Sequence, residues 1–208
     1  MEKYILDTNI FFNMESGFGL GNKTEDVVKK VTELANKLKK QKKAEFFMPP
    51  RAVEEFLGFF ENKEEPFLRA FLSAIIVKAP ETSSVNFPAA VFYQLVADIR
   101  QRSYRGLNIG EEEIENTARK TQGKEAPDKK SFQIGVGQHI KTFRERYRNA
   151  TRVGFLDSVA DLDLIVLSKE QDGFLITTDE GVLRWGRTFG VKEMPAVAWV
   201  KRLEETLD

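Results

Sequence analysis

The stretch Tyr4-Ile5-Leu6-Asp7-Thr8-Asn9 gives the clearest indication of the fold. A short apolar run stops at three polar residues, which is typical of a buried strand with polar side chains at its carboxyl end. Phe174-Leu175-Ile176-Thr177-Thr178 repeats this pattern late in the chain and is followed by Asp179-Glu180-Gly181. Open α/β sheets bind ligands beyond the carboxyl ends of their strands, so both stretches predict residues of a functional site.

Strand and helix patterns alternate between and around these two stretches. A helical pattern begins at Thr24, Phe46-Phe47-Met48 forms a second apolar run, and Pro49-Pro50 opens another helical pattern. A further helix is expected from Ser158 to Glu170, just before the late strand. Because strands that alternate with helices pair in parallel, the sequence predicts an α/β fold with a central parallel sheet between layers of helices.

The middle of the chain has a different character, because helical patterns follow one another there without a strand. A loop from Gly123 to Asp128 separates the last two of three expected helices. We therefore predict one α/β domain, residues 1–85 and 153–208, which is interrupted by an all-helical arm, residues 86–152. The three expected helices are Pro88 to about Leu107, Glu111 to Thr121 and about Phe132 to Arg152.

Composition restricts the chemistry that the protein can perform. The chain has 208 residues, is 41% hydrophobic and contains 17 Phe, enough for a core in one or two domains. It has no Cys and a single His, which argues against disulfides, zinc clusters, thiol nucleophiles and a histidine-based triad. Any catalysis must therefore use carboxylates. No apolar run approaches the ~20 residues of a membrane span and the chain opens on a strand pattern, so we expect a cytoplasmic protein without a membrane partner.

The charges balance overall but are unevenly distributed. The chain has 32 Lys and Arg against 32 Asp and Glu, yet Arg100 to Arg152 contains 13 basic and 7 acidic residues, an excess of 13 − 7 = +6. Lys141, Arg144 and Arg148 are spaced to share one helix face, which predicts a stripe that can follow a phosphate backbone. The alternative is that these residues only lie on the solvent-exposed face of a helix and bind nothing.

Aspartates occur at three places where a parallel sheet would gather ligands. Asp7 and Asp179 each follow a strand, and Asp157 and Asp161 are four residues apart on one helix face, where two like charges repel. Each Asp alone could cap a helix or turn. As a set they predict a Mg²⁺ site, with Mn²⁺ as a substitute, because Mg²⁺ is bound by a few carboxylate oxygens near a phosphate. Asp163 lies about 200° round the helix from Asp161 and is expected to be a supporting or solvent residue.

These acidic motifs resemble those of PIN-domain nucleases. The combination of Asp157-Ser158-Val159-Ala160-Asp161 with the late Thr-Asp-Glu-Gly ending, Pro49-Pro50 and the basic helical arm is similar to HARP, the homologues of the Aquifex protein-only ribonuclease P. The resemblance implies Mg²⁺-dependent removal of 5′ leaders from precursor tRNA, no RNA subunit, and dimers that assemble into larger homo-oligomers. Position by position, it places the catalytic acids at Asp7, Asp157, Asp161, Asp179 and Glu180. The last is a Glu where an Asp is common.

Within this interpretation the acids have different expected roles. Asp7, Asp161 and Asp179 would bind the principal metal, while Asp157 and Glu180 would bind a second ion or orient water. A further acid is expected on the second helix. Helical phase favours Glu54 over Glu55, because Glu54 flanks a face formed by Val53, Phe56 and Leu57.

Apolar side chains suggest a core and an assembly surface. The stripe Phe56, Phe59, Phe60 and Phe67 is expected to be core and not a platform for bases. The face of the arm that carries Val91, Phe92, Leu95 and Val96 is expected to serve self-association in part, with packing inside the arm as the alternative.

Two other functions fit parts of the sequence. A PIN-type toxin or another general endoribonuclease would share the acids, although such toxins are typically short and lack an inserted helical arm. A non-catalytic RNA-binding or assembly module would use the basic helices and keep the acids as helix caps. Dependence of activity on a metal ion separates the catalytic functions from the last one.

Overall fold

Five parallel strands form one sheet in the order β3-β2-β1-β4-β5. The structure, a computed structural model, describes residues 1–12, 20–21, 23–123, 127–156 and 158–207. In the register, Tyr4 lies opposite both Phe46 and Phe174. The predicted α/β fold with a parallel sheet is confirmed. The strands are β1 (Glu2–Leu6), β2 (Ala44–Met48), β3 (Ile76–Val77), β4 (Phe174–Ile176) and β5 (Lys192–Glu193).

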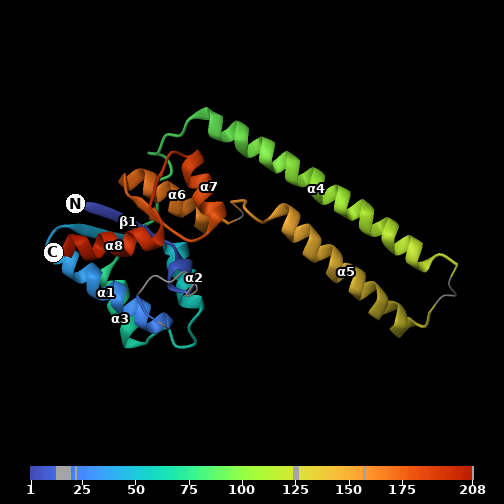
Figure 1. The fold of residues 1–208 in the computed structure, drawn as a ribbon, viewed down its shortest axis with the longest axis horizontal. Coiled ribbons are helices and arrows are strands. Elements are labelled where there is room, and N and C mark those ends of the chain that lie inside the picture. The colour runs from blue at the N-terminus through green and yellow to red at the C-terminus, as the bar shows by residue number, and fades with distance from the viewer. Residues whose placement is uncertain (13–19, 22, 124–126, 157, 208) are drawn as a thin grey trace. The chain divides into compact units, whose positions relative to one another are not determined.

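Helices in two groups cover this sheet (Figure 1). One group is α1 (Thr24–Lys40), α3 (Pro66–Ala74) and α8 (Ala196–Leu207), and the other is α2 (Pro50–Gly58), α6 (Val159–Gln171) and α7 (Glu180–Thr188). A 3-10 turn, η1 (Thr8–Phe11), follows β1 directly. Sheet and helices together form the first of two units, residues 1–87 and 156–208, and residues 88–155 form the second.

Large aromatic side chains fill the core of the first unit. The ring of Trp199 on α8 meets those of Tyr4 and Phe46 edge-on, with centroids 6.2 Å apart in both pairs. All three side chains are almost completely buried, and each buried aromatic residue contributes roughly 1.5–3 kcal/mol to folding. Tyr4, Ile5 and Leu6 are all 0% exposed, so the apolar run of β1 is fully buried up to Asp7.

The turn between α6 and β4 brings the backbone close to β1. Asp172 ends α6 in the left-handed conformation, with φ 50°. Gly173 follows, and a Cβ there would lie 2.5 Å from the Ile5 side chain. Glycine at this position therefore allows β4 to pair next to β1.

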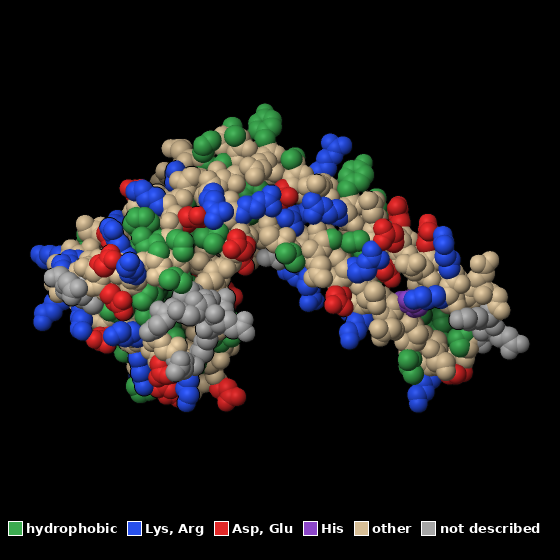
Figure 2. All heavy atoms as spheres, viewed as in Figure 1, with side chains coloured by type: hydrophobic (Ala, Val, Ile, Leu, Met, Phe, Trp, Pro, Cys, Tyr) green, Lys and Arg blue, Asp and Glu red, His purple; other side chains and the backbone are tan. Residues whose placement is uncertain are grey.

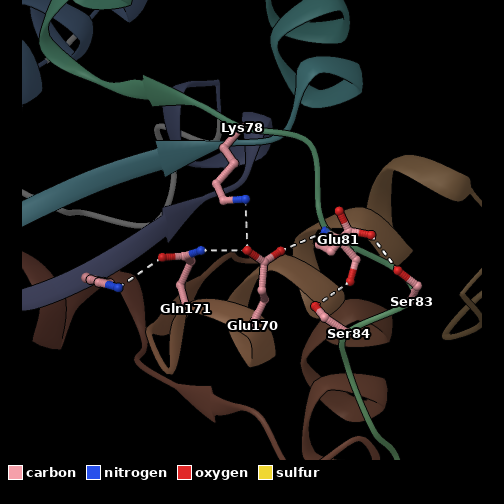
Figure 3. Close-up of polar contacts among 7 residues, drawn as sticks. Lys78, Glu81, Ser83, Ser84, Glu170 and Gln171 are labelled. Atoms are coloured by element: carbon pink, nitrogen blue, oxygen red, sulfur yellow. Dashed lines mark hydrogen bonds and ion pairs between the residues drawn. The ribbon is translucent and has the colours of Figure 1, made fainter.

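A polar network fastens the segment after β3 to the end of α6 (Figure 3). Glu170 accepts a hydrogen bond from the Glu81 amide at 2.7 Å and pairs with Lys78 at 2.8 Å. Gln171 donates to Glu170 at 2.8 Å and accepts from Lys3 at 2.9 Å. Burial tends to raise the pKa of Glu170, but the contacts with Lys78 and Glu81 leave it below its ordinary value. Together with the ring contact between Phe87 and Phe189, this network holds the chain in the first unit until α4 begins.

The second unit is a hairpin of two long helices, α4 (Ala89–Thr121) and α5 (Lys129–Thr151). The predicted break between Leu107 and Glu111 is wrong, because α4 continues through it as one helix of 33 residues. Gly106 serves close packing here instead of ending a helix: a Cβ on it would lie 2.6 Å from the Tyr147 ring on α5.

Arg102 joins the two helices of the hairpin from a buried position. It pairs with Asp98 at 2.9 Å and donates to the carbonyl oxygens of Thr151, Val153 and Gly154 at 3.0–3.2 Å. Its guanidinium also lies 4.8 Å from the centre of the Phe155 ring. The last carbonyls of a helix lack the amide of a following turn, and Arg102 donates hydrogen bonds to three carbonyls at this end of α5.

Apolar, basic and acidic side chains are mixed on the face of the hairpin that Figure 2 shows. Phe92 and Val96 are 55% and 64% exposed, whereas Val91 is buried and Leu95 half-buried. Two helices cannot bury every apolar side chain against each other, which leaves an apolar surface on this unit. Among the described residues, no helix combines the length and the apolar character that crossing a membrane would require.

Candidate active site

Asp7 occupies the carboxyl end of β1, in the centre of the sheet. Its amide donates to the Ile176 carbonyl on β4 at 3.0 Å, which continues the pairing of the two strands by one residue. The side chain is only 6% exposed, and Oδ2 accepts a hydrogen bond from the Thr177 hydroxyl. The predicted strand end therefore presents a buried carboxylate.

The surroundings of Asp7 oppose its negative charge. Burial raises the pKa of Asp7 to about 7, and the charges of Asp161 and Glu55 raise it as well. Hydrogen bonds from Thr177 and the Asn9 amide act in the opposite direction but do not outweigh these effects. The charges of Asp161 and Glu55 thus act on the buried Asp7, and a cation near Asp7 would relieve both the burial and the repulsion.

Thr177 and Asn9 organise this end of the sheet, and sequence reasoning assigned them no role. Asn9 Nδ2 donates to Thr177 Oγ1 at 3.2 Å, and Asn9 Oδ1 accepts from the Thr178 amide at 3.1 Å. The Asp179 amide donates to the same Thr177 hydroxyl at 3.0 Å. Thr177 therefore connects Asp7 with Asp179. The only sequence signal for the roles of Thr177 and Asn9 was that polar residues follow both strands.

Asp179 is the N-cap of α7, as the alternative interpretation of this residue had it. Its Oδ1 accepts hydrogen bonds from the amides of Gly181 and Val182 at 2.7 and 3.0 Å. These bonds fix the carboxylate, and they involve only one of its two oxygens. Glu180 is the first residue of α7 and is exposed.

The first turn of α6 carries Asp161, whose charge acts on Asp7. Ser158 is the N-cap of this helix, and its hydroxyl oxygen accepts a hydrogen bond from the Asp161 amide at 3.0 Å. Asp157 itself lies outside the described residues. Asp163 is buried and pairs with Arg51 of α2 at 2.6 Å, which agrees with its expected supporting role.

Glu55, and not the preferred Glu54, is the glutamate of α2 whose charge acts on Asp7. The preference for Glu54 assumed a core face of Val53, Phe56 and Leu57. In the structure Leu57 is only half-buried, whereas Ala52 is 1% exposed. At about 100° per residue, including Ala52 turns the buried face toward Glu55 and away from Glu54.

The carboxylate oxygens gathered here have the chemistry that Mg²⁺ prefers. In the part of the chain that the structure describes, no three Asp, Glu or His side chains lie close enough together to hold a metal ion. Asp7, Asp161 and Glu55 nevertheless interact as charges, and burial of Asp7 makes its anion unfavourable without a partner. The donor set thus fits a hard divalent cation.

The predicted basic stripe lies on α5, in the second unit. Lys141, Arg144 and Arg148 are all exposed and share one side of the helix. Arg146, another basic residue of α5, instead forms ion pairs with Glu112 and Glu113 of α4. Three cations therefore face a hollow of ≈ 650 Å³. Its lining is Gly137, Ile140, Lys141, Arg144, Glu145, Arg148 and Asn149.

The parallel sheet, with acids beyond β1 and β4, agrees with the expected PIN-like fold. The chain belongs to the PINc domain ribonuclease family, whose model matches residues 3–208. It is therefore a hydrolytic endoribonuclease. Enzymes with the PIN domain are generally metal-dependent.

Individual relatives narrow the comparison further. The chain is 33% identical over 208 residues to "RNA-free ribonuclease P" of Pyrococcus furiosus. The aligned residues make up 100% of this chain and 96% of the relative. The protein of the same name from Ignicoccus hospitalis is 33% identical, with coverage of 100% and 97%. That from Thermodesulfovibrio yellowstonii is 32% identical, with coverage of 91% and 87%. These matches confirm the predicted resemblance to HARP.

Proposed function

We propose that this chain is an RNA-free ribonuclease P that removes the 5′ leader from precursor tRNA. The observation that carries the proposal is the buried Asp7 carboxylate with Asp161 and Glu55 acting on it, in a chain that matches enzymes of this name along its whole length. The reaction is hydrolysis. Water oxygen bonds to phosphorus, the bond from phosphorus to the leader 3′ oxygen breaks, and the tRNA keeps a 5′-phosphate.

Asp7, Asp161 and Asp179 hold the principal metal in this proposal, with Mg²⁺ as the expected ion and Mn²⁺ as a substitute. Asp157 and Glu180 bind a second ion or orient the attacking water. A bound metal supplies a reactive water and neutralises charge on the phosphate. Support comes from the unfavourable anion at Asp7 and from the cap that fixes Asp179. Thr177 aligns Asp7 and Asp179 through its shared hydroxyl.

The second unit grips RNA through Lys141, Arg144 and Arg148. Their exposure on one side of α5 suits contact with successive phosphates, and Glu145 is the acidic residue in the same hollow. Double-stranded RNA is recognised mainly by shape, phosphates and 2′-hydroxyls, so this contact adds little sequence preference. No RNA subunit takes part.

Self-association also involves the second unit. Phe92 and Val96 remain exposed along α4, and apolar surface of this kind is normally covered by a partner. A second copy of this chain covers it in dimers, and the dimers assemble into a larger homo-oligomer.

A direct test compares precursor tRNA with an unstructured RNA of equal length, each incubated with the purified protein in Mg²⁺ and in EDTA. The proposal predicts one cut in precursor tRNA, in Mg²⁺ only, and little cleavage of the unstructured RNA. Equal cleavage of both RNAs favours a toxin or another general endoribonuclease. Binding without any cleavage favours a non-catalytic RNA-binding module.

A further inference from the structure

Three different side chains follow one another along one side of α2. Arg51, Glu55 and Phe59 are four residues apart, so they lie on the same side of the helix. Phe59 is the C-cap residue and keeps a helical backbone, with φ −79° and ψ −10°. Glu55 acts on Asp7, and Arg51 pairs with Asp163 while its side chain remains 58% exposed.

Phe59 contradicts the expectation that the whole aromatic stripe is core. It is 59% exposed, whereas Phe56, three residues earlier, is 0% exposed. Because Phe56 points into the core, Phe59 falls toward the edge of the same helix, where its ring meets solvent. An exposed aromatic ring of this size, one turn after Glu55 on the same helix, invites a functional explanation.

The exposed ring is held in place from one side. Phe12 lies against it with the ring centroids 4.2 Å apart and the planes 31° from parallel. Phe12 in turn contacts Phe56 and Phe60, with centroid distances of 6.0 and 5.9 Å. The core thus supports Phe12, and Phe12 supports Phe59, which leaves a fixed aromatic surface that needs little ordering when a ligand binds.

Two short stretches of the chain connect this aromatic surface with the carboxylates. Glu55 is one helical turn, about 6 Å of rise, before Phe59. Phe12 immediately follows η1, the short turn that starts beyond Asp7. We therefore expect an RNA strand with its cleaved phosphate at Asp7 to pass along α2 toward Phe59.

We propose that Phe59, supported by Phe12, stacks on an unpaired base of the leader next to the cleaved bond. This inference rests on the proposed function, because it requires an RNA strand at the Asp7 carboxylates. Aromatic rings bind bases of any sequence in this way, since every base has a π face. Arg51, two turns before Phe59 on the same side of α2, provides guanidinium N–H donors for a phosphate of the same RNA strand.

The first experiment measures stacking without cleavage. Precursor tRNA carries the fluorescent base 2-aminopurine at each of the last leader positions in turn and is bound to the Asp161→Asn variant. We expect strong quenching at one position, and loss of that quenching when Phe59→Ala or Phe59→Leu is added. Phe59→Trp should restore it. Quenching that is unaffected by Phe59→Ala at every position overturns the proposal, whether or not the wild type cleaves precursor tRNA.

The second experiment combines protein and substrate changes in single-turnover cleavage. Removing the base at the position identified by fluorescence should raise the concentration of wild-type protein that gives half-maximal cleavage by about 5- to 100-fold. Phe59→Leu should show the same loss on the intact substrate and no added loss on the abasic one. If Phe59→Leu and removal of the base act independently, so that their effects on half-saturation multiply, the proposal is overturned.

Two controls separate other causes. Val197→Ala removes apolar surface from an exposed position on α8 and should change neither readout. Sedimentation compares Phe59→Leu with the wild type, and unchanged assembly is expected. A change in assembly would assign Phe59 to a contact between copies of the chain and overturn the proposal. Absence of any precursor tRNA cleavage by the wild type instead contradicts the proposed function.

Discussion

Asp7 is the residue whose surroundings carry the most information about function. A buried carboxylate near two other acids is costly as an anion, and a protein rarely keeps such a group unless a cation or a proton joins it. The Thr177 hydroxyl and the Asn9 amide hold Asp7 in position without removing this cost. The residue is thus prepared for a divalent ion.

Substitution of the proposed ligands tests this directly. We expect Asp7→Asn, Asp161→Asn and Asp179→Asn each to lower precursor tRNA cleavage by at least ~10²-fold, because each removes a charged ligand. Asn can still cap a helix, so Asp179→Asn should leave α7 intact. Circular dichroism provides the folding control. Near-wild-type cleavage by the triple variant would remove the nuclease mechanism.

Stability of the metal-free protein should depend on pH through Asp7. The folded pKa of about 7 lies above the ordinary value of 3.8, so the folded state binds this proton more tightly than the unfolded chain. The free energy of unfolding therefore falls as pH rises from about 4 to 7, by roughly 1.4 kcal/mol per unit, and then levels off.

Denaturant unfolding in EDTA measures this effect at pH 5 and pH 8. Relative to Asp7→Asn, the wild type should lose about 3 kcal/mol over this interval. Identical pH dependence of the two proteins would show that Asp7 does not titrate in this range.

The sequence predicted where Asp7, Asp161 and Asp179 lie in the fold, and their role at a metal site stays a prediction. Asp7 and Asp179 could be found because each ends an apolar strand, and Asp161 because of its four-residue spacing from Asp157. Thr177 could not be assigned, because its role depends on β4 lying next to β1, a pairing of residues far apart in the chain. Glu54 was preferred to the alternative Glu55 because the expected core face of α2 left out Ala52, a small residue that is buried.

At the scale of elements, α4 and α5 depend on one buried cation. Arg102→Lys should destabilise the hairpin by roughly 3 kcal/mol or more, because an ammonium cannot serve Asp98 and three carbonyls at once. Hydrogen exchange should rise at the end of α5. Arg105→Lys, an exposed substitution one turn away, is the matched control. Equal protection in both variants would contradict the role of Arg102.

The basic side of α5 should act on binding more than on turnover. Replacing Lys141, Arg144 and Arg148 with Ala should raise KM for precursor tRNA and lower the slope of log affinity against log salt by about two to three. A triple variant of Lys37, Lys39 and Lys40 on α1 makes the same change in charge and serves as control. Normal binding with lost turnover would place the α5 residues at the chemical centre instead.

Prediction of the elements succeeded where the patterns were long. The strands at Tyr4, Phe46 and Phe174 are confirmed, as is the helical arm. The two-residue strands β3 and β5 carry no periodicity, and α8 went unrecognised although Trp199 completes the core. The expected break between Leu107 and Glu111 is absent, and the packing of Gly106 against Tyr147, 41 residues away, could not be read from the local pattern.

At the scale of the whole molecule, the apolar surface of the hairpin predicts self-association. Sedimentation at micromolar concentration should show the wild type larger than a monomer. Phe92→Glu with Val96→Glu should shift it toward monomer, since charges oppose burial of this face. Val197→Glu, on the exposed side of α8, should not. A monomeric wild type would reject the assembly proposal.

We propose that this chain, without RNA of its own, cuts precursor tRNA at a metal site built on Asp7. Mapping the 5′ end of the product made by the purified protein tests this proposal. We expect a single 5′-phosphate end at the start of mature tRNA, formed in Mg²⁺, absent in EDTA and reduced at least ~10²-fold by Asp7→Asn. Ends scattered along the RNA, or the same product from Asp7→Asn at the wild-type rate, would contradict it.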